Sequence, residues 1–228
     1  MISFLAPILA PIFAVIFGVL IVLLHRKSKP LNLKLFLAFS GAFLLSSTIF
    51  ELLPEVYSHL EPKRIGIFIM GGILLQIILE FYSKGAEHGH LHINEPKSLF
   101  PWLLFMSLGI HAFFEGFPLR EHKNLIIGVV IHKIPIAILI ATYLLKSKLA
   151  KSKVIIFILI FTLMTPLGSL IGGFLNIPSN IIQSVNAVVI GMFFHISTII
   201  LFESSEGHNF NMNKILIIVS AIVLAYFI

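Results

Sequence analysis

Eight apolar stretches, separated by short polar breaks, make up almost the whole of this 228-residue sequence. A helix needs about 20 predominantly apolar residues to cross the hydrocarbon core of a bilayer. The stretches run over 2–24, 33–56, 65–83, 99–119, 124–145, 154–176, 180–203 and 213–228. With 58% hydrophobic and 11% charged residues, the chain is too apolar for a soluble domain of this length. We therefore expect an all-α polytopic membrane protein with eight transmembrane helices, forming a single domain over 1–228 in the lipid bilayer.

Lysine and arginine are distributed unevenly among the polar breaks. Of the 16 basic residues, eleven lie in or directly beside the first, third, fifth and seventh breaks, four lie in the second, fourth and sixth, and Lys133 lies well inside a stretch. Cytoplasmic loops carry the excess of basic residues, so both termini are predicted to be extracytoplasmic, with the plasma membrane as the expected location. The formal net charge of +6 is explained by this topology near anionic lipid head groups, and it requires no nucleic-acid partner.

Several residues and motifs are missing from the sequence, and they limit its chemistry. The chain has no cysteine, which excludes disulfides, thiolate metal ligands and cysteine-based catalysis. It also lacks the glycine-rich lysine motif that cradles phosphates, which disfavours ATP-driven pumping. The first apolar stretch has no basic leader and no small-residue cleavage site, so we expect it to be retained as a membrane helix.

Three ionisable residues interrupt the fourth and fifth apolar stretches. His111 and Glu115 are four residues apart and share one helical face, and His132 lies about as far after the intervening polar turn as His111 lies before it. Antiparallel helices would bring all three to nearly the same depth. Ionisable groups in hydrocarbon are costly and are functional by default. Imidazole and carboxylate together suit zinc, iron, manganese or cobalt, so His111, Glu115 and His132 are predicted metal ligands.

An alternative applies to each histidine alone, because a single intramembrane histidine is commonly hydrogen-bonded to a neighbouring helix. Three ionisable residues at matched depth favour a functional site instead. Lys133 points about 100° away from its neighbour His132 on a helical wheel. We expect Lys133 to pair with a carboxylate such as Glu115, or to extend toward the interface.

Further polar residues are placed along a route through the bilayer. They are Glu51, Glu55 and His59 at the outer end of the second stretch, Ser107 one turn before His111, and His195, Glu203, Glu206 and His208 toward the inner side. The outer residues could gather cations and the inner ones could receive them. Interfacial capping explains Glu55 and His59 equally well, and a solvated helix end explains Glu203, Glu206 and His208. Serine in a membrane helix more often bonds backbone than ligand.

The third polar break, at about 84–98, differs from the others in composition. It carries His88, His90 and His92 beside Glu87 and Glu95. Alternate imidazoles on a glycine-containing loop suit weak, exchangeable binding of zinc-like ions, although a plain polar linker would look similar. The orientation above places this loop in the cytoplasm.

Four segments make the chain similar to the ZIP (Zrt/Irt-like) family of divalent-metal transporters. They are His111-Ala-Phe-Phe-Glu-Gly116, His132-Lys-Ile-Pro-Ile-Ala137, the Leu-Leu-Pro-Glu end of 41–55, and Gly191 to Glu203, which resembles a divergent seventh helix. The first two are the specific ones. The resemblance implies a ZIP-like bundle of eight helices whose substrate is zinc or a similar ion, with iron, manganese, cadmium and cobalt as the alternatives. It places the metal site between the fourth and fifth helices and implies alternating access.

The sequence departs from the family pattern at three positions near this site. Many members carry asparagine at the position of Ala112 and glutamate at that of Ile136, and together these build a two-metal site. Lys133 occupies the position of another ligand. We therefore predict one bound ion instead of two, with weaker discrimination between zinc and similar ions because the site is less negative.

Two other functions compete with transport. An intramembrane zinc-dependent hydrolase would use the metal to activate water, but the chain contains no aspartate, no His-Glu-x-x-His and no Gly-x-Ser-x-Gly. A non-transporting membrane metal sensor would bind metal without flux. We expect a transporter and not an enzyme. The oligomeric state is open, a homodimer included.

Overall fold

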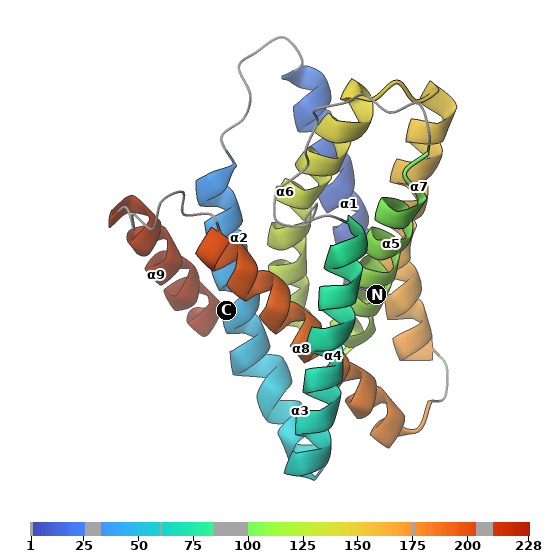
Figure 1. Cartoon of the computed structure of the whole chain (residues 1–228). Helices are drawn as coiled ribbons and strands as arrows, with labels where there is room; N and C mark the ends of the chain where they lie inside the picture. Colours follow the sequence, from blue (N-terminus) through green and yellow to red (C-terminus); the bar gives the residue numbers. More distant parts are fainter. Residues whose placement is uncertain (1, 26–32, 60, 84–99, 175–176, 204–211) are drawn as a thin grey trace.

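The computed structural model describes residues 2–25, 33–59, 61–83, 100–174, 177–203 and 212–228, and Figure 1 shows their arrangement. These residues are almost entirely helical, and no strand occurs among them. The elements are α1 (Ile2–Leu24), α2 (Lys34–Ser47), the π-helical turn η1 (Thr48–Leu52), α3 (Leu53–His59), α4 (Pro62–Ser83), α5 (Trp102–Gly116), the 3₁₀ turn η3 (Phe117–Arg120), α6 (Lys123–Lys146), α7 (Lys151–Phe174), α8 (Ser179–Glu203) and α9 (Met212–Phe227).

The expected all-helical membrane architecture is confirmed. Seven helical segments are long and apolar enough to cross a membrane, among them the continuous run Lys34–His59, which joins α2, η1 and α3. The eighth, α9, is a shorter apolar helix of 16 residues, which gives a length of about 24 Å at 1.5 Å per residue. Large apolar side chains such as Phe17, Ile67 and Phe81 are exposed on the outside of the bundle, where a bilayer would cover them.

The helices pack in two groups. In the first group α1 packs on α6 and α7, and α5 packs on α7; in the second group α8 packs on α4 and α2, and α9 packs on α2. The groups meet where α2 contacts α6 and where α4 contacts α5. In Figure 1, α8 crosses the bundle obliquely and α9 lies at its edge. We call α1, α5, η3, α6 and α7 the first group, and α2, η1, α3, α4, α8 and α9 the second group.

Glycines bring paired helices of each group into close contact. A Cβ atom at Gly191 on α8 would lie 2.0 Å from the carbonyl oxygen of Ile69 on α4, and one at Gly72 on α4 would lie 2.0 Å from that of Val188. In the first group, a Cβ atom at Gly168 on α7 would lie 1.9 Å from the carbonyl oxygen of Phe113 on α5. Small residues permit this backbone approach, which drives helix association in lipid.

Prolines explain two interruptions of the second and fourth spans. Pro54 has no N–H to donate to a carbonyl in the preceding turn, and that turn is the π-helical η1, which contains Glu51. Pro118 lies in η3, which ends the fourth span and directs the chain toward α6. Both interruptions lie toward the end of the bundle at which α3 ends and α6 and α8 begin.

Candidate metal centre

His111 and Glu115 lie one turn apart on the same face of α5, because residues four apart on a helix project in nearly the same direction. The His111 Nε2 atom lies 3.3 Å from the Glu115 Oε2 atom. Both residues are buried, with 4% and 2% of their surfaces exposed. The spacing seen in the sequence therefore yields a buried imidazole–carboxylate pair inside the bundle.

Helix α6 brings His132 to this pair. The His111 and His132 ring centroids are 6.3 Å apart, with the ring planes at 79°. Two imidazoles bound to one zinc ion at the usual Zn–N distance place their centroids about 5–6 Å apart. The two histidines are therefore close enough to share an ion after a small side-chain rotation. The antiparallel arrangement of α5 and α6 places them at nearly the same depth.

Lys133 pairs with Glu115, as considered from the sequence. Its Nζ atom forms an ion pair and a hydrogen bond with Glu115 Oε1. The same ammonium group lies 5.0 Å from the centroid of the Phe161 ring on α7, within the range of a cation–π contact. One carboxylate oxygen thus faces the lysine, while the other faces His111.

Helix α7 contributes Thr165, which the sequence analysis did not identify. The Thr165 hydroxyl donates a hydrogen bond of 2.9 Å to Glu115 Oε1, and its residue is fully buried. The contact depends on close packing, since a Cβ atom at Gly116 would lie 2.2 Å from the Thr165 carbonyl oxygen. Nothing in the local sequence distinguishes Thr165 from a threonine that bonds its own helix.

Ser107 lies apart from this arrangement, although it is buried on the same helix. Its hydroxyl donates a 2.5 Å hydrogen bond to the carbonyl oxygen of Leu79, and so joins α5 to α4. Ser107 therefore links the two groups of helices through a backbone acceptor.

His195 on α8 pairs with Glu80 on α4, another residue that the sequence analysis missed. The His195 Nε2 atom lies 2.5 Å from Glu80 Oε2, and both side chains are largely buried. Glu80 is near the end of α4 that precedes the third polar break, so this pair lies on the predicted cytoplasmic side of the bundle.

The remaining predicted site residues have different positions. Glu51 is half-buried in η1. Glu203 is the last residue of α8, and its side chain lies outside the described part. Outside the described residues altogether lie Glu206, His208 and the loop histidines His88, His90 and His92, which remain sequence-based predictions.

These features are those of a polytopic helical membrane protein with ionisable side chains buried inside its bundle. Residues 83–226 match the family model of the ZIP zinc transporter. Because the match covers more than half of the sequence, the chain belongs to the ZIP family. ZIP proteins are transporters, so the family is not one of enzymes.

Two curated relatives are similar to parts of the chain. Protein zntD of Dictyostelium discoideum is 22% identical over 150 residues, which cover 56% of this chain and 22% of the relative. Zinc transporter ZIP1 of Danio rerio is 28% identical over 93 residues, which cover 38% of this chain and 31% of the relative. The chain thus aligns with less than a third of the length of either relative.

Proposed function

We propose that this protein carries a divalent transition-metal ion, zinc first among them, across the plasma membrane into the cytoplasm. His111, Glu115 and His132 are the proposed ligands of a single ion. The observation that carries the proposal is the buried contact between His111 and Glu115, with a second imidazole within reach on α6. Nitrogen and oxygen donors of this kind bind zinc, iron, manganese, cadmium or cobalt. Zinc is preferred because the matched family and one relative are named for it.

Charge supports a site for one ion. Lys133 and Glu115 form a buried ion pair, so the carboxylate already has one neighbouring positive charge. The fixed ammonium group of Lys133 occupies part of the space that a second metal ion would need, and it supplies part of the positive charge that this ion would supply. An ion bound by His111 and Glu115 Oε2 therefore adds to an arrangement that is close to neutral. We propose that this makes the site less selective among transition metals.

The two groups of helices support alternating access. His111, Glu115, His132, Lys133 and Thr165 all belong to the first group, so the ligands can move together as one unit. Movement of this group against the second would open the site to one side of the membrane at a time. The His195–Glu80 pair on the second group is the proposed acceptor of the ion on the cytoplasmic side.

The remaining sequence predictions accompany this proposal. The chain acts as one transmembrane domain with its termini outside the cytoplasm, surrounded by lipid, and Glu51 helps to recruit cations. A homodimer stays a prediction from the sequence.

Metal flux into proteoliposomes tests the proposal. We expect His111→Ala, Glu115→Ala and His132→Ala each to lower zinc uptake to the level of protein-free liposomes, while His25→Ala, a change of an exposed histidine at the end of α1, leaves it unchanged. Parallel assays with iron, manganese, cadmium and cobalt define the substrate range. Flux that survives all three changes contradicts the proposed site, and binding without flux would identify a sensor.

A further inference from the structure

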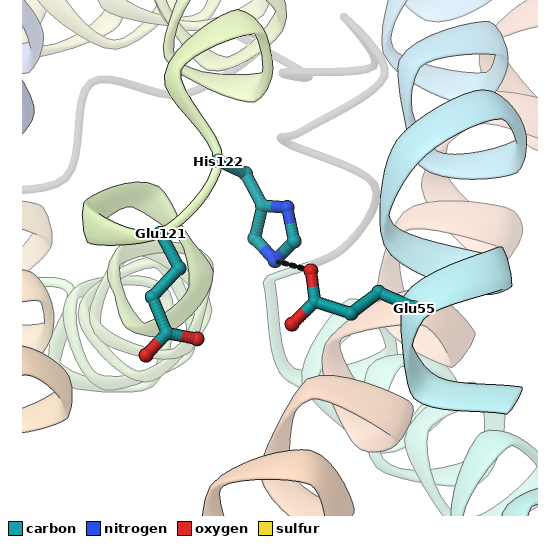
Figure 2. A group of neighbouring side chains, drawn as sticks. All are labelled: Glu55, Glu121 and His122. Carbon is teal, nitrogen blue, oxygen red and sulfur yellow. Dashed lines mark ion pairs between the residues drawn. The ribbon is translucent and has the colours of Figure 1, made fainter. Parts of the chain in front are cut away.

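A second set of metal-ligating side chains gathers at the end of the bundle where α3 ends and α6 begins. Among the residues that the structure describes, one group of three offers ligand atoms that all lie within 4.8 Å of one another: Glu55, Glu121 and His122. Figure 2 shows the His122 ring directed at the Glu55 carboxylate, with Glu121, the residue before His122, beside the pair. The side chains come from two segments far apart in the sequence, so their meeting is a product of the fold.

His122 is the residue whose geometry points to a ligand. Only 7% of it is exposed, and its Nε2 atom lies 3.0 Å from Glu55 Oε2. That buried nitrogen nevertheless makes no hydrogen bond with any residue that the structure describes, because its contact with the carboxylate lacks hydrogen-bond geometry. His122 also precedes α6 without forming a side-chain cap for the helix. A buried ring nitrogen that faces a carboxylate without hydrogen-bond geometry places two metal-ligating atoms next to each other.

Glu55 is held in position by α8. Gln183 Nε2 donates a 3.1 Å hydrogen bond to Glu55 Oε1, and Gln183 itself is buried. One oxygen of Glu55 is therefore fixed, and the other remains directed at His122. Glu121 is exposed and supplies a carboxylate on the solvent side. One imidazole and two carboxylates form a donor set that suits a zinc-class divalent ion.

The cluster is separate from the central site. His132 follows His122 by ten residues along α6, which corresponds to about 15 Å at 1.5 Å per residue. It also joins the two groups of helices, since Glu55 and Gln183 belong to the second group and Glu121 and His122 adjoin η3 and α6 of the first. An ion at this position would bridge the groups at the bundle end that the basic-residue distribution predicts to be extracytoplasmic.

We propose that Glu55, Glu121 and His122 form a second divalent-metal site, which takes a zinc-class ion at the mouth of the bundle before it reaches the centre. Metal binding there stands independently, whereas its place on the entry route rests on the proposed function. Because the ligands come from both groups of helices, the site is complete only while the two groups lie together at this end as they do in this structure. Ion transfer to the centre then requires that the two groups separate.

Metal titration of the full chain in detergent tests the proposal in a background that lacks the two central histidine ligands. We expect the His111→Ala/His132→Ala protein to bind one Co²⁺ or Zn²⁺ per chain, followed by the visible absorption of Co²⁺ and by equilibrium dialysis of Zn²⁺. Adding His122→Ala should weaken this binding at least about tenfold. Adding Glu121→Gln, at an exposed position where folding is not at risk, should weaken it in the same direction.

The matched control is His59→Ala, which removes an exposed histidine from the same end of the bundle and should leave the affinity unchanged. Size-exclusion chromatography verifies that each variant is folded. Absence of an ion in the background protein overturns the proposal, as does binding that depends on His59 but not on His122 and Glu121. If no ion binds at Glu55, Glu121 and His122 while wild-type flux still requires His111, the second site is contradicted and the proposed transport function is not. If an ion binds at Glu55, Glu121 and His122 but flux does not depend on His111, Glu115 and His132, the proposed transport site is contradicted and the second metal site is not.

Discussion

Lys133 on α6 and Glu115 on α5 form an ion pair in which each residue is only 2% exposed. The pair joins two adjacent spans at the depth of the two histidines, and Thr165 on α7 adds a third attachment to the same carboxylate. A charged pair is retained in a low-dielectric interior only when its partners satisfy each other. The central site is therefore assembled around Glu115, whose two oxygens serve different purposes.

The Lys133→Met substitution should destabilise the metal-free protein. It leaves Glu115 as a buried carboxylate without its cation, and breaking a buried pair in this way costs about 3–5 kcal/mol. Zinc should recover more stability in this variant than in the wild type, because the ion supplies the missing positive charge beside Glu115. Thermal unfolding in detergent with and without Zn²⁺ measures both effects.

Lys153→Met, which removes an exposed lysine of α7, is the control and should leave both melting temperatures unchanged. An equal zinc effect in the wild type and in Lys133→Met would show that the lysine does not compensate the charge of Glu115.

The Gly168→Ala substitution should separate α5 from α7. Its Cβ atom would lie 1.9 Å from the Phe113 carbonyl oxygen, so the backbones must move apart. Overpacking of this kind costs about 1–3 kcal/mol, and it would draw Thr165 away from Glu115. We expect a lower melting temperature and weaker zinc binding. Gly71→Ala is the matched control, since its Cβ atom would meet nothing within 4 Å; an equal loss of stability there would refute the packing argument.

The Glu80→Gln substitution should slow zinc release without altering zinc affinity at the centre. The change removes the charge opposite His195, while the central ligands lie on other helices. We expect a severalfold lower flux into proteoliposomes with an unchanged dissociation constant. Glu61→Gln, at the exposed start of α4, should change neither quantity. A parallel fall in affinity would place Glu80 in the central binding site instead.

Acidification should weaken zinc binding. Imidazole binds metal only in its neutral form, so protons compete with the ion for His111 and His132. Each of the two imidazoles must be neutral to bind, so the apparent affinity should fall progressively as the pH is lowered. Titration of Zn²⁺ binding between pH 8 and pH 5 measures the slope. An affinity independent of pH would exclude histidine ligation.

Cysteine labelling should reveal the orientation of the chain, which has no cysteine of its own. Lys148→Cys, between α6 and α7, should react with a membrane-impermeant maleimide only after the cells are permeabilised. Lys63→Cys, at the start of α4, should react in intact cells. These expectations follow from the excess of basic residues in the odd-numbered breaks. The opposite pattern would reverse the proposed topology and with it the direction of uptake.

Local patterns in the sequence were enough to predict the helices and the relative positions of His111, Glu115 and His132. Apolar stretches of the right length predicted the helices, and the four-residue spacing of His111 and Glu115 predicted a shared face on one of them. The polar turn midway between His111 and His132 predicted their common depth. Each of these follows from the length and periodicity of a single helix, or of two helices joined by a short turn, and needs no knowledge of how distant helices pack.

The contacts of Glu115 with Thr165, of Glu80 with His195, and of Glu55 with Gln183 were decided only by the tertiary structure. These partners lie 50, 115 and 128 residues apart, on helices that are apolar on most of their faces. Lipid is as apolar as a buried helix surface, so hydropathy does not fix how such a helix turns about its axis. The rotation is set by close packing at glycines such as Gly116, Gly168 and Gly191, and that packing selects which polar side chains meet.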